Sequence, residues 1–338
     1  MKRLGIVLLL MLYVCVSFVS CSTIFDSNED CEMQFQVKFE YDMNMKFADA
    51  FANSVSYVAL YVYDAATEKL VLRQEESGEA LKQKNYVMVL EDLMPGTYDL
   101  LAWCGDGLEE GNFDLPMHSI GNSEKEANVC TMEREWGAKV TTDVRQLFHG
   151  AKRVTFDAVY DVQQEVLSLT KNTNTVRVIL QHLSGQDVDP SLFTFEIKDK
   201  NGVMGHDNAV LDDEVISYYP WSVTSGTAGI DADVFGTKAQ TSVSVALAEF
   251  TVSRLVAEND PVLTIYNKLK GTTVLSIPLK DYALLVKGQY NKSMSDQEYL
   301  DRQDEYNLTF FLDEFGNWAS SRVIINSWHL VLQDSELQ

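Results

Sequence analysis

The chain has 338 residues, of which 46% are hydrophobic and 23% charged, and this composition is typical of a folded globular protein rather than a disordered one. Fifty acidic residues against 27 Lys and Arg give a formal net charge of −23. We therefore expect no nucleic-acid partner, because neutralising phosphates requires a basic face, and charge alone would not hold the chain on an anionic membrane. At about 150 residues per domain, this length predicts two domains.

The first twenty residues have the pattern of an export signal. Lys2 and Arg3 precede an apolar stretch, residues 4–18, which is shorter than the roughly 20 residues that a membrane-spanning helix needs. The next three residues, Val-Ser-Cys at 19–21, resemble a bacterial lipobox. We therefore predict a signal peptide over residues 1–20, lipidation of Cys21 and a lipidated tether over residues 21–30. The alternative is an ordinary cleaved signal, in which Cys21 has no special role.

Three further cysteines follow the signal and Cys21. In an oxidising export compartment, Cys31, Cys104 and Cys130 can form one disulfide among them, and their spacing does not select the pair. No CxxC pair or Cys/His cluster occurs, so no metal site is expected.

Strand patterns dominate residues 31–166. Alternating apolar and polar residues predict a half-buried strand over residues 34–41, and the run at 55–63, apolar on both faces, predicts a central strand. We expect further strands at 70–73, 86–90 and 98–104, a surface loop at 106–128, and short helices at 43–53 and 142–149. Short strands joined by turns at this spacing predict a β-sandwich domain.

A second β-sandwich is expected over residues 167–338. Asn201-Gly202 predicts a hairpin turn, and the capping box that begins at Ser295 predicts a helix to about residue 303. Residues 205–236 are expected to be irregular, and the alternation over 322–332 predicts one long terminal strand. The remaining strands are expected at 175–183, 193–197, 242–247, 249–252, 262–266, 274–277 and 306–312. The fold class is thus all-β, with two tandem sandwiches and a few short helices.

Signatures of catalysis are missing from the sequence. It contains no phosphate-binding loop, no dinucleotide fingerprint, no nucleophile elbow and no HExxH pair, so we expect neither an enzyme nor a cofactor. Two groups of aromatic residues could instead bind sugars. Tyr57, Tyr61 and Tyr63 are expected in the core, whereas Tyr218, Tyr219 and Trp221 are expected to be exposed in a loop.

Several short sequence segments resemble, in the same order, those of the FimB/Mfa-type fimbrial anchor family of bacteroidetes. They include FEYDMNMKFADAF at 39–51, VALYVYD at 58–64, QLFHG at 146–150, QEYLDRQDEY at 297–306 and IINSWHLVL at 324–332. The resemblance runs from about residue 31 to residue 333. It implies an outer-membrane lipoprotein with two transthyretin-like sandwich domains at the base of a type V pilus. We expect this lipoprotein to face the cell exterior. Such a protein binds a fimbrial shaft subunit, ends the fibre and has no catalytic role.

The predicted terminal strand is the candidate for contact with the shaft. An unpaired sheet edge can accept a strand from a neighbour, so we expect residues 322–332 to pair in the groove of the first shaft subunit. The partner-strand residues would be Val323, Ile325, Trp328, Leu330 and Leu332. Equally, this strand could complete its own domain. The second function considered is a glycan-binding surface lipoprotein, accessory to carbohydrate uptake, that uses Tyr219 and Trp221.

Overall fold

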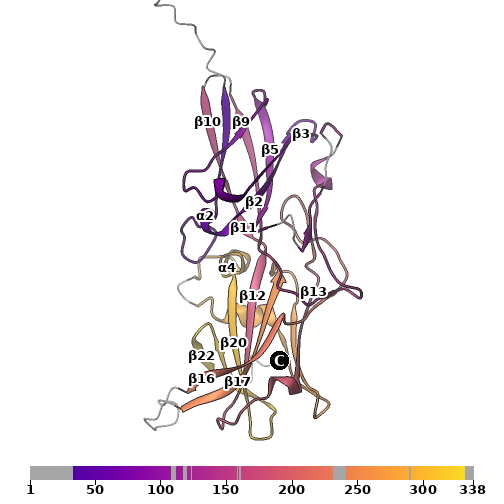
Figure 1. Cartoon of the computed structure of the whole chain (residues 1–338), viewed down its shortest axis with the longest axis vertical. Coiled ribbons are helices and arrows are strands. Elements are labelled where there is room, and N and C mark those ends of the chain that lie inside the picture. The colour runs from indigo at the N-terminus through magenta and orange to yellow at the C-terminus, as the bar shows by residue number, and fades with distance from the viewer. Residues whose placement is uncertain are drawn as a thin grey trace, which may run out of the picture.

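The computed structural model describes residues 33–107, 112–116, 120–122, 124–157, 159, 161–230, 241–288 and 291–331. Cys21, Cys31, Leu332 and the predicted signal and tether lie outside these residues. The described chain consists mainly of strands that form an N-terminal and a C-terminal part, one above the other in Figure 1. The all-β prediction is confirmed. The transthyretin-like assignment stays a prediction.

Two sheets form the N-terminal part. The first has the order β10 (Val162–Ser168), β1 (Gln34–Glu40), β4 (Met88–Leu90). The second is antiparallel, with the order β11 (Thr170–Lys171), β9 (Leu147–Phe156), β5 (Gly96–Gly105), β2 (Tyr57–Asp64), β3 (Leu70–Ser77). Buried residues of both sheets, among them Phe35, Leu60 and Phe156, form a first hydrophobic core. Strand β1 alternates between buried and partly exposed residues, as predicted.

Strand β2 is buried on both faces, which confirms the prediction for the run at 55–63. Val58, Leu60 and Val62 belong to the first core, while Tyr61 and Tyr63 belong to a second core that continues into the C-terminal part. Successive side chains of a strand point to opposite faces, so this sheet has to be covered on both sides.

The C-terminal part also contains two large sheets. The first has the order β16 (Ser222–Ile230), β17 (Thr241–Ser253), β12 (Thr173–His182), β20 (Glu305–Leu312), β21 (Trp318–Ile325), β22 (Trp328–Val331). The second has the order β19 (Thr272–Pro278), β18 (Val262–Asn267), β13 (Phe193–Asp199), β15 (Ile216–Tyr218), β8 (Lys139–Val140). Both sheets contribute residues to the second core, among them Val178, Ile197, Phe250 and Leu308.

The segment that follows β5 crosses from the N-terminal to the C-terminal part. Strand β8 pairs with β15, and β7 (Cys130–Met132) pairs with β14 (Val203–Met204) and β6 (Phe113–Asp114). Phe113, Met132 and Val140 pack in the second core, where they cover the outer face of the β2 sheet. The boundary predicted at residues 166 and 167 therefore differs from the structure: β10 continues to Ser168, and part of the first range belongs to the C-terminal sheets.

The helices of the described chain are short. The predicted helix after Ser295 is confirmed as α4 (Asp296–Arg302), where the Ser295 side chain accepts a hydrogen bond from the Glu298 backbone N–H at 3.0 Å. The other helical segments are α2 (Phe51–Ser54), α3 (Leu279–Leu285) and the 3-10 turns Gly78–Ala80, Lys125–Ala127 and Pro190–Leu192. Of the helix predicted at 43–53, only α2 is present.

Several local predictions were wrong, because of distant pairing or of a turn. Residues 205–236, expected to be irregular, contain β15 and β16. The end of the helix predicted at 142–149 lies in β9, which pairs with β5 over ten residues from Gly96 to Gly105. Asn201-Gly202 makes no hairpin, because β13 pairs with β15 and β18 while β14 joins another sheet. Residues 322–332 are not one strand: Asn326 and Ser327, with φ of 47° and 70°, turn the chain from β21 into β22.

Candidate functional sites

The predicted lipidation site lies outside the described residues. The first described strand after it, β1, shows in which direction the chain runs through the N-terminal part. Strand β1 begins at Gln34, and its last residue, Glu40, accepts a backbone hydrogen bond from Leu169 at 2.8 Å. Since Leu169 lies four residues before β12, β1 runs toward the C-terminal part. The first described residues therefore lie at the far end of the N-terminal part (Figure 1).

The C-terminal hairpin completes its own sheet. Val323 and Ile325 are fully buried in the second core, and β21 pairs with β20 on one side and β22 on the other. Both residues therefore pack in the core of their own domain. Trp328 and Leu330 lie on β22, opposite Ile325 and Val323, and β22 is the last strand of this sheet in the described chain.

The cysteines that the structure describes are free thiols. Cys104 lies in the first core and Cys130 in the second, so the β2 sheet separates them and they form no disulfide with each other. Burial raises the pKa of both thiols. A disulfide between these two residues, one of the pairings allowed by the sequence, is not present.

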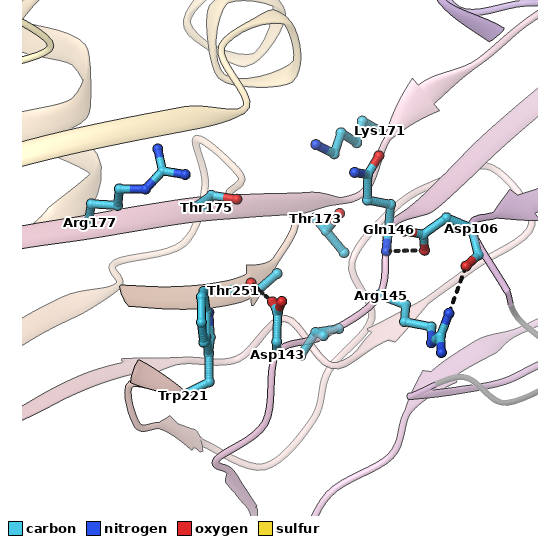
Figure 2. Close-up of a pocket in the computed structure, with 11 residues that line it drawn as sticks. Asp106, Asp143, Arg145, Gln146, Lys171, Thr173, Thr175, Arg177, Trp221 and Thr251 are labelled. Atoms are coloured by element: carbon cyan, nitrogen blue, oxygen red, sulfur yellow. Dashed lines mark hydrogen bonds between the residues drawn. The ribbon is translucent and has the colours of Figure 1, made fainter. Parts of the chain in front are cut away.

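A polar cavity of about 460 Å³ lies where the two parts meet (Figure 2). It is lined by residues from several separate segments: Asp106, Asp143, Val144, Arg145, Gln146, Lys171, Thr173, Thr175, Arg177, Trp221 and Thr251. We call it the junction cavity. In Figure 2, Arg177 and Trp221 lie on the left of this group, and Asp106, Arg145 and Gln146 lie on the right.

Strand alternation builds the floor of the junction cavity. Thr173, Thr175 and Arg177 are alternate residues of β12, and the intervening Val176 points into the second core. Thr251 is directly opposite Thr175 in the sheet.

Trp221 is held at the rim by the same sheet. Its backbone N–H donates to the Glu249 carbonyl at 3.0 Å, and its side chain is 38% exposed. The expectation of exposure is confirmed for Trp221 and wrong for Tyr218, which is fully buried at the end of β15. The neighbouring Tyr219 donates its hydroxyl to Glu196 at 3.0 Å, and Tyr57, Tyr61 and Tyr63 are core residues, as predicted.

The opposite wall comes from residues 143–146, which are fixed by hydrogen bonds. Asp143 accepts from the Thr251 hydroxyl at 2.6 Å, and the Asp106 carboxylate accepts from the Gln146 N–H at 2.9 Å. The Arg145 guanidinium donates to the Asp106 carbonyl at 3.0 Å. This wall therefore has a defined position relative to β12 and β17.

Carboxylates compensate two of the cations of the cavity. Lys171 lies 2.8 Å from Asp304, and Arg177 lies 3.0 Å from Glu249 and 3.3 Å from Glu305. In contrast, the Thr173 hydroxyl is buried without a hydrogen-bond partner, and its residue is 1% exposed. A buried hydroxyl without a partner costs about 1–3 kcal/mol.

Further polar contacts join the two parts around the cavity. Asn172 and Asn208 exchange side-chain hydrogen bonds, and the Arg302 guanidinium donates to the Asp42 carbonyl at 3.1 Å. The His149 ring bonds to the His206 carbonyl at 3.0 Å, and burial lowers the pKa of His149 to about 4. The junction is thus bonded on several sides and is not an open linker.

The structure shows neither a metal cluster nor a membrane span in the part of the chain that it describes. No three His, Cys, Asp or Glu side chains are grouped there in a way that could hold a metal ion. None of the described helices is long and apolar enough to cross a bilayer.

Comparison with known families identifies the chain. The family model of the fimbrillin-A associated anchor proteins Mfa1 and Mfa2 matches residues 28–334. The chain belongs to this family. No curated protein matches it.

Solved structures share this fold. A candidate adhesin from Bacteroides thetaiotaomicron is 30% identical, with a TM-score of 0.81 over 91% of this chain and 100% of the other. A candidate polysaccharide-binding protein from the same organism is 31% identical, with a TM-score of 0.77 over 90% and 100% of the two chains. The fimbrial anchor protein Mfa2 from Porphyromonas gingivalis has the same fold at 15% identity, with a TM-score of 0.66 over 90% and 100%.

Proposed function

We propose that this fimbrial anchor family member is an outer-membrane lipoprotein, facing the cell exterior, that holds a fimbrial shaft and ends its assembly without catalysis. Membership of the anchor family over residues 28–334 carries the proposal. The sequence at 19–21 adds a lipobox, which would place a lipid on Cys21 at the start of the exported chain. Lipid and fold together would connect a membrane to a fibre.

The orientation of the strands supports different roles for the two parts, with the N-terminal part near the membrane and the C-terminal part near the shaft. Because β1 starts at the end remote from the C-terminal part, a lipid on Cys21 would leave the C-terminal sheets farthest from the membrane. The shaft would then contact the C-terminal part, and pull on the anchor along its length. The ion pair of Lys171 with Asp304, and the hydrogen bonds of Arg302 and Asn172, would carry this load across the junction.

Strand pairing at an exposed edge is the contact that we propose with the shaft subunit. Strand β22 ends the C-terminal sheet in the described chain, and the outer side of such a strand offers unpaired backbone N–H and C=O groups. Because Val323 and Ile325 are buried in their own core, a strand of the shaft would add beside β22, and β21 would stay in place. We propose this arrangement in place of the one expected from the sequence, in which residues 322–332 pair in the groove of the shaft subunit.

The lipid-anchor proposal is tested by Cys21→Ala in the native host. Fimbriae on cells and fimbriae in the medium are separated by centrifugation and quantified, and the lengths of the released fibres are measured by electron microscopy. We expect intact fibres to move into the medium together with this protein. Release of the protein alone, with the fibres still on the cells, would contradict the anchor role.

The strand-pairing proposal needs two matched deletions. Removal of residues 328–338 eliminates β22 but keeps Val323 and Ile325, so the protein should fold and fail to retain fimbriae. Removal of residues 332–338 keeps β22 and should retain them. Equal retention by both deletions would exclude pairing at β22.

A further inference from the structure

We propose that the junction cavity binds a short, uncharged saccharide, a function in addition to fimbrial anchoring. The cavity volume of about 460 Å³ falls within the range of ordinary small-molecule sites, about 300–1,000 Å³. Its walls are held by hydrogen bonds between segments far apart in the sequence, such as Thr251 with Asp143. The site is therefore formed before any ligand binds.

One wall offers an apolar surface that suits the face of a sugar ring. Trp221 lines the cavity and keeps 38% of its surface exposed, although its backbone is fixed to Glu249. A pyranose has an apolar face of C–H groups, and burying this face against an indole ring removes apolar surface from water.

The floor offers hydrogen bonds that the protein itself does not use. The Thr173 hydroxyl is buried and has no partner, although this residue lines the cavity. A ligand hydroxyl at this position would both donate and accept, and would remove the cost of the unpaired group. The Thr175 hydroxyl and the Gln146 amide belong to residues that also line the cavity, and they offer further donors and acceptors.

The charges around the cavity favour a neutral ligand over an anion. Lys171 and Arg177 are already paired with Asp304, Glu249 and Glu305. An anionic ligand would have to compete with these carboxylates. Arg145, the third cation of the lining, is hydrogen-bonded to the Asp106 carbonyl, and the carboxylates of Asp143 and Asp106 would repel an anion. An uncharged polyhydroxyl compound breaks none of these pairs.

The experiment uses the mature protein, extracted from cells in a detergent without a sugar headgroup. Saturation-transfer NMR and calorimetry are recorded with D-glucose, D-galactose, D-mannose, N-acetyl-D-glucosamine, lactose and N,N′-diacetylchitobiose. We expect at least one of these probes to bind with a Kd on the order of 1 mM or tighter. D-glucuronate is the charged comparison and is expected to bind more weakly than D-glucose.

Three variants assign the binding to the cavity. Trp221→Ala should abolish it, whereas Trp136→Ala should leave it unchanged, because Trp136 is 96% exposed and does not line the cavity. Thr173→Val should weaken it by about three- to tenfold, which is the value of one hydrogen bond. Since the Thr173 hydroxyl has no partner in the free protein, this variant should not lower the unfolding midpoint.

Several results would overturn the proposal. The first is that no neutral probe binds. The second is that Trp221→Ala binds a probe as tightly as the wild type does, and the third is that only D-glucuronate binds. A lower unfolding midpoint for Thr173→Val would show that the Thr173 hydroxyl is paired in the free protein. This hydroxyl would then no longer support ligand binding at the floor of the cavity. None of these results depends on the retention of fimbriae, so the anchor proposal is tested separately.

Discussion

The substitution Ile325→Ala tests whether the C-terminal hairpin belongs to its own domain. Ile325 is fully buried in the second core, between its sheet partners Leu308 and Trp328. Shortening a fully buried Ile to Ala removes its transfer free energy and leaves a cavity, at a cost of about 2–5 kcal/mol. A folded domain is stable by only about 5–15 kcal/mol, so this loss is large enough to measure by denaturation.

The assay is guanidinium unfolding of the purified protein, followed by circular dichroism. Ile324→Ala is the matched control, because Ile324 is the adjacent residue on the opposite, partly exposed face of the same strand. We expect the control to lower the free energy of unfolding by clearly less than Ile325→Ala does. Equal and small losses for the two variants would refute the reasoning, and would indicate that this strand is free to pair with a partner.

Three other predictions concern buried polar groups. Burial raises the pKa of Asp199 to about 6, so the ionised form of this carboxyl opposes folding. The folded protein should therefore lose stability as the pH rises from about 4 through about 6. Asp199→Asn should remove that loss, as measured by urea titrations at several pH values. The Arg153 and Lys125 side chains lower the pKa of Asp99 to about 2. Asp99→Asn should therefore lower the free energy of unfolding by about 1–2 kcal/mol at neutral pH and by much less at about pH 2, where the wild-type carboxylate is itself half protonated. Cys104 and Cys130 should resist iodoacetamide in the folded protein and react after denaturation, as counted by intact mass; modification before unfolding would contradict their burial.

Local patterns predicted the elements whose environment is set by their own sequence. The alternation in β1 follows directly from one buried and one partly exposed face. The helix after Ser295 was predictable because its N-cap hydrogen bond joins residues three positions apart. The burial of β2 on both faces was visible in its composition, although the segment that covers its second face was not.

Elements decided by distant partners could not be predicted in this way. Strand β9 exists because it pairs with β5, some fifty residues earlier. The turn that divides the predicted terminal strand needs positive φ at Asn326 and Ser327. Asn adopts this conformation more readily than most residues, so Asn326 was the available signal, but the unbroken apolar alternation outweighed it.

The junction cavity shows the same limit. Its residues come from the residue that follows β5, from residues 143–146 before β9, and from strands β11, β12 and β17, together with Trp221. Trp221 was identified from the sequence because an aromatic residue in a loop is a recognisable signal. The unpaired hydroxyl of Thr173 left no such signal, because it depends on what surrounds it after folding.

The central claim is that this protein occupies one end of each fimbria. Fibres released from cells that carry Cys21→Ala can be labelled with antibody to this chain and gold, and viewed by electron microscopy. The account predicts label at a single end of each fibre. Label along the shaft, or unlabelled fibres with the protein elsewhere, would contradict it.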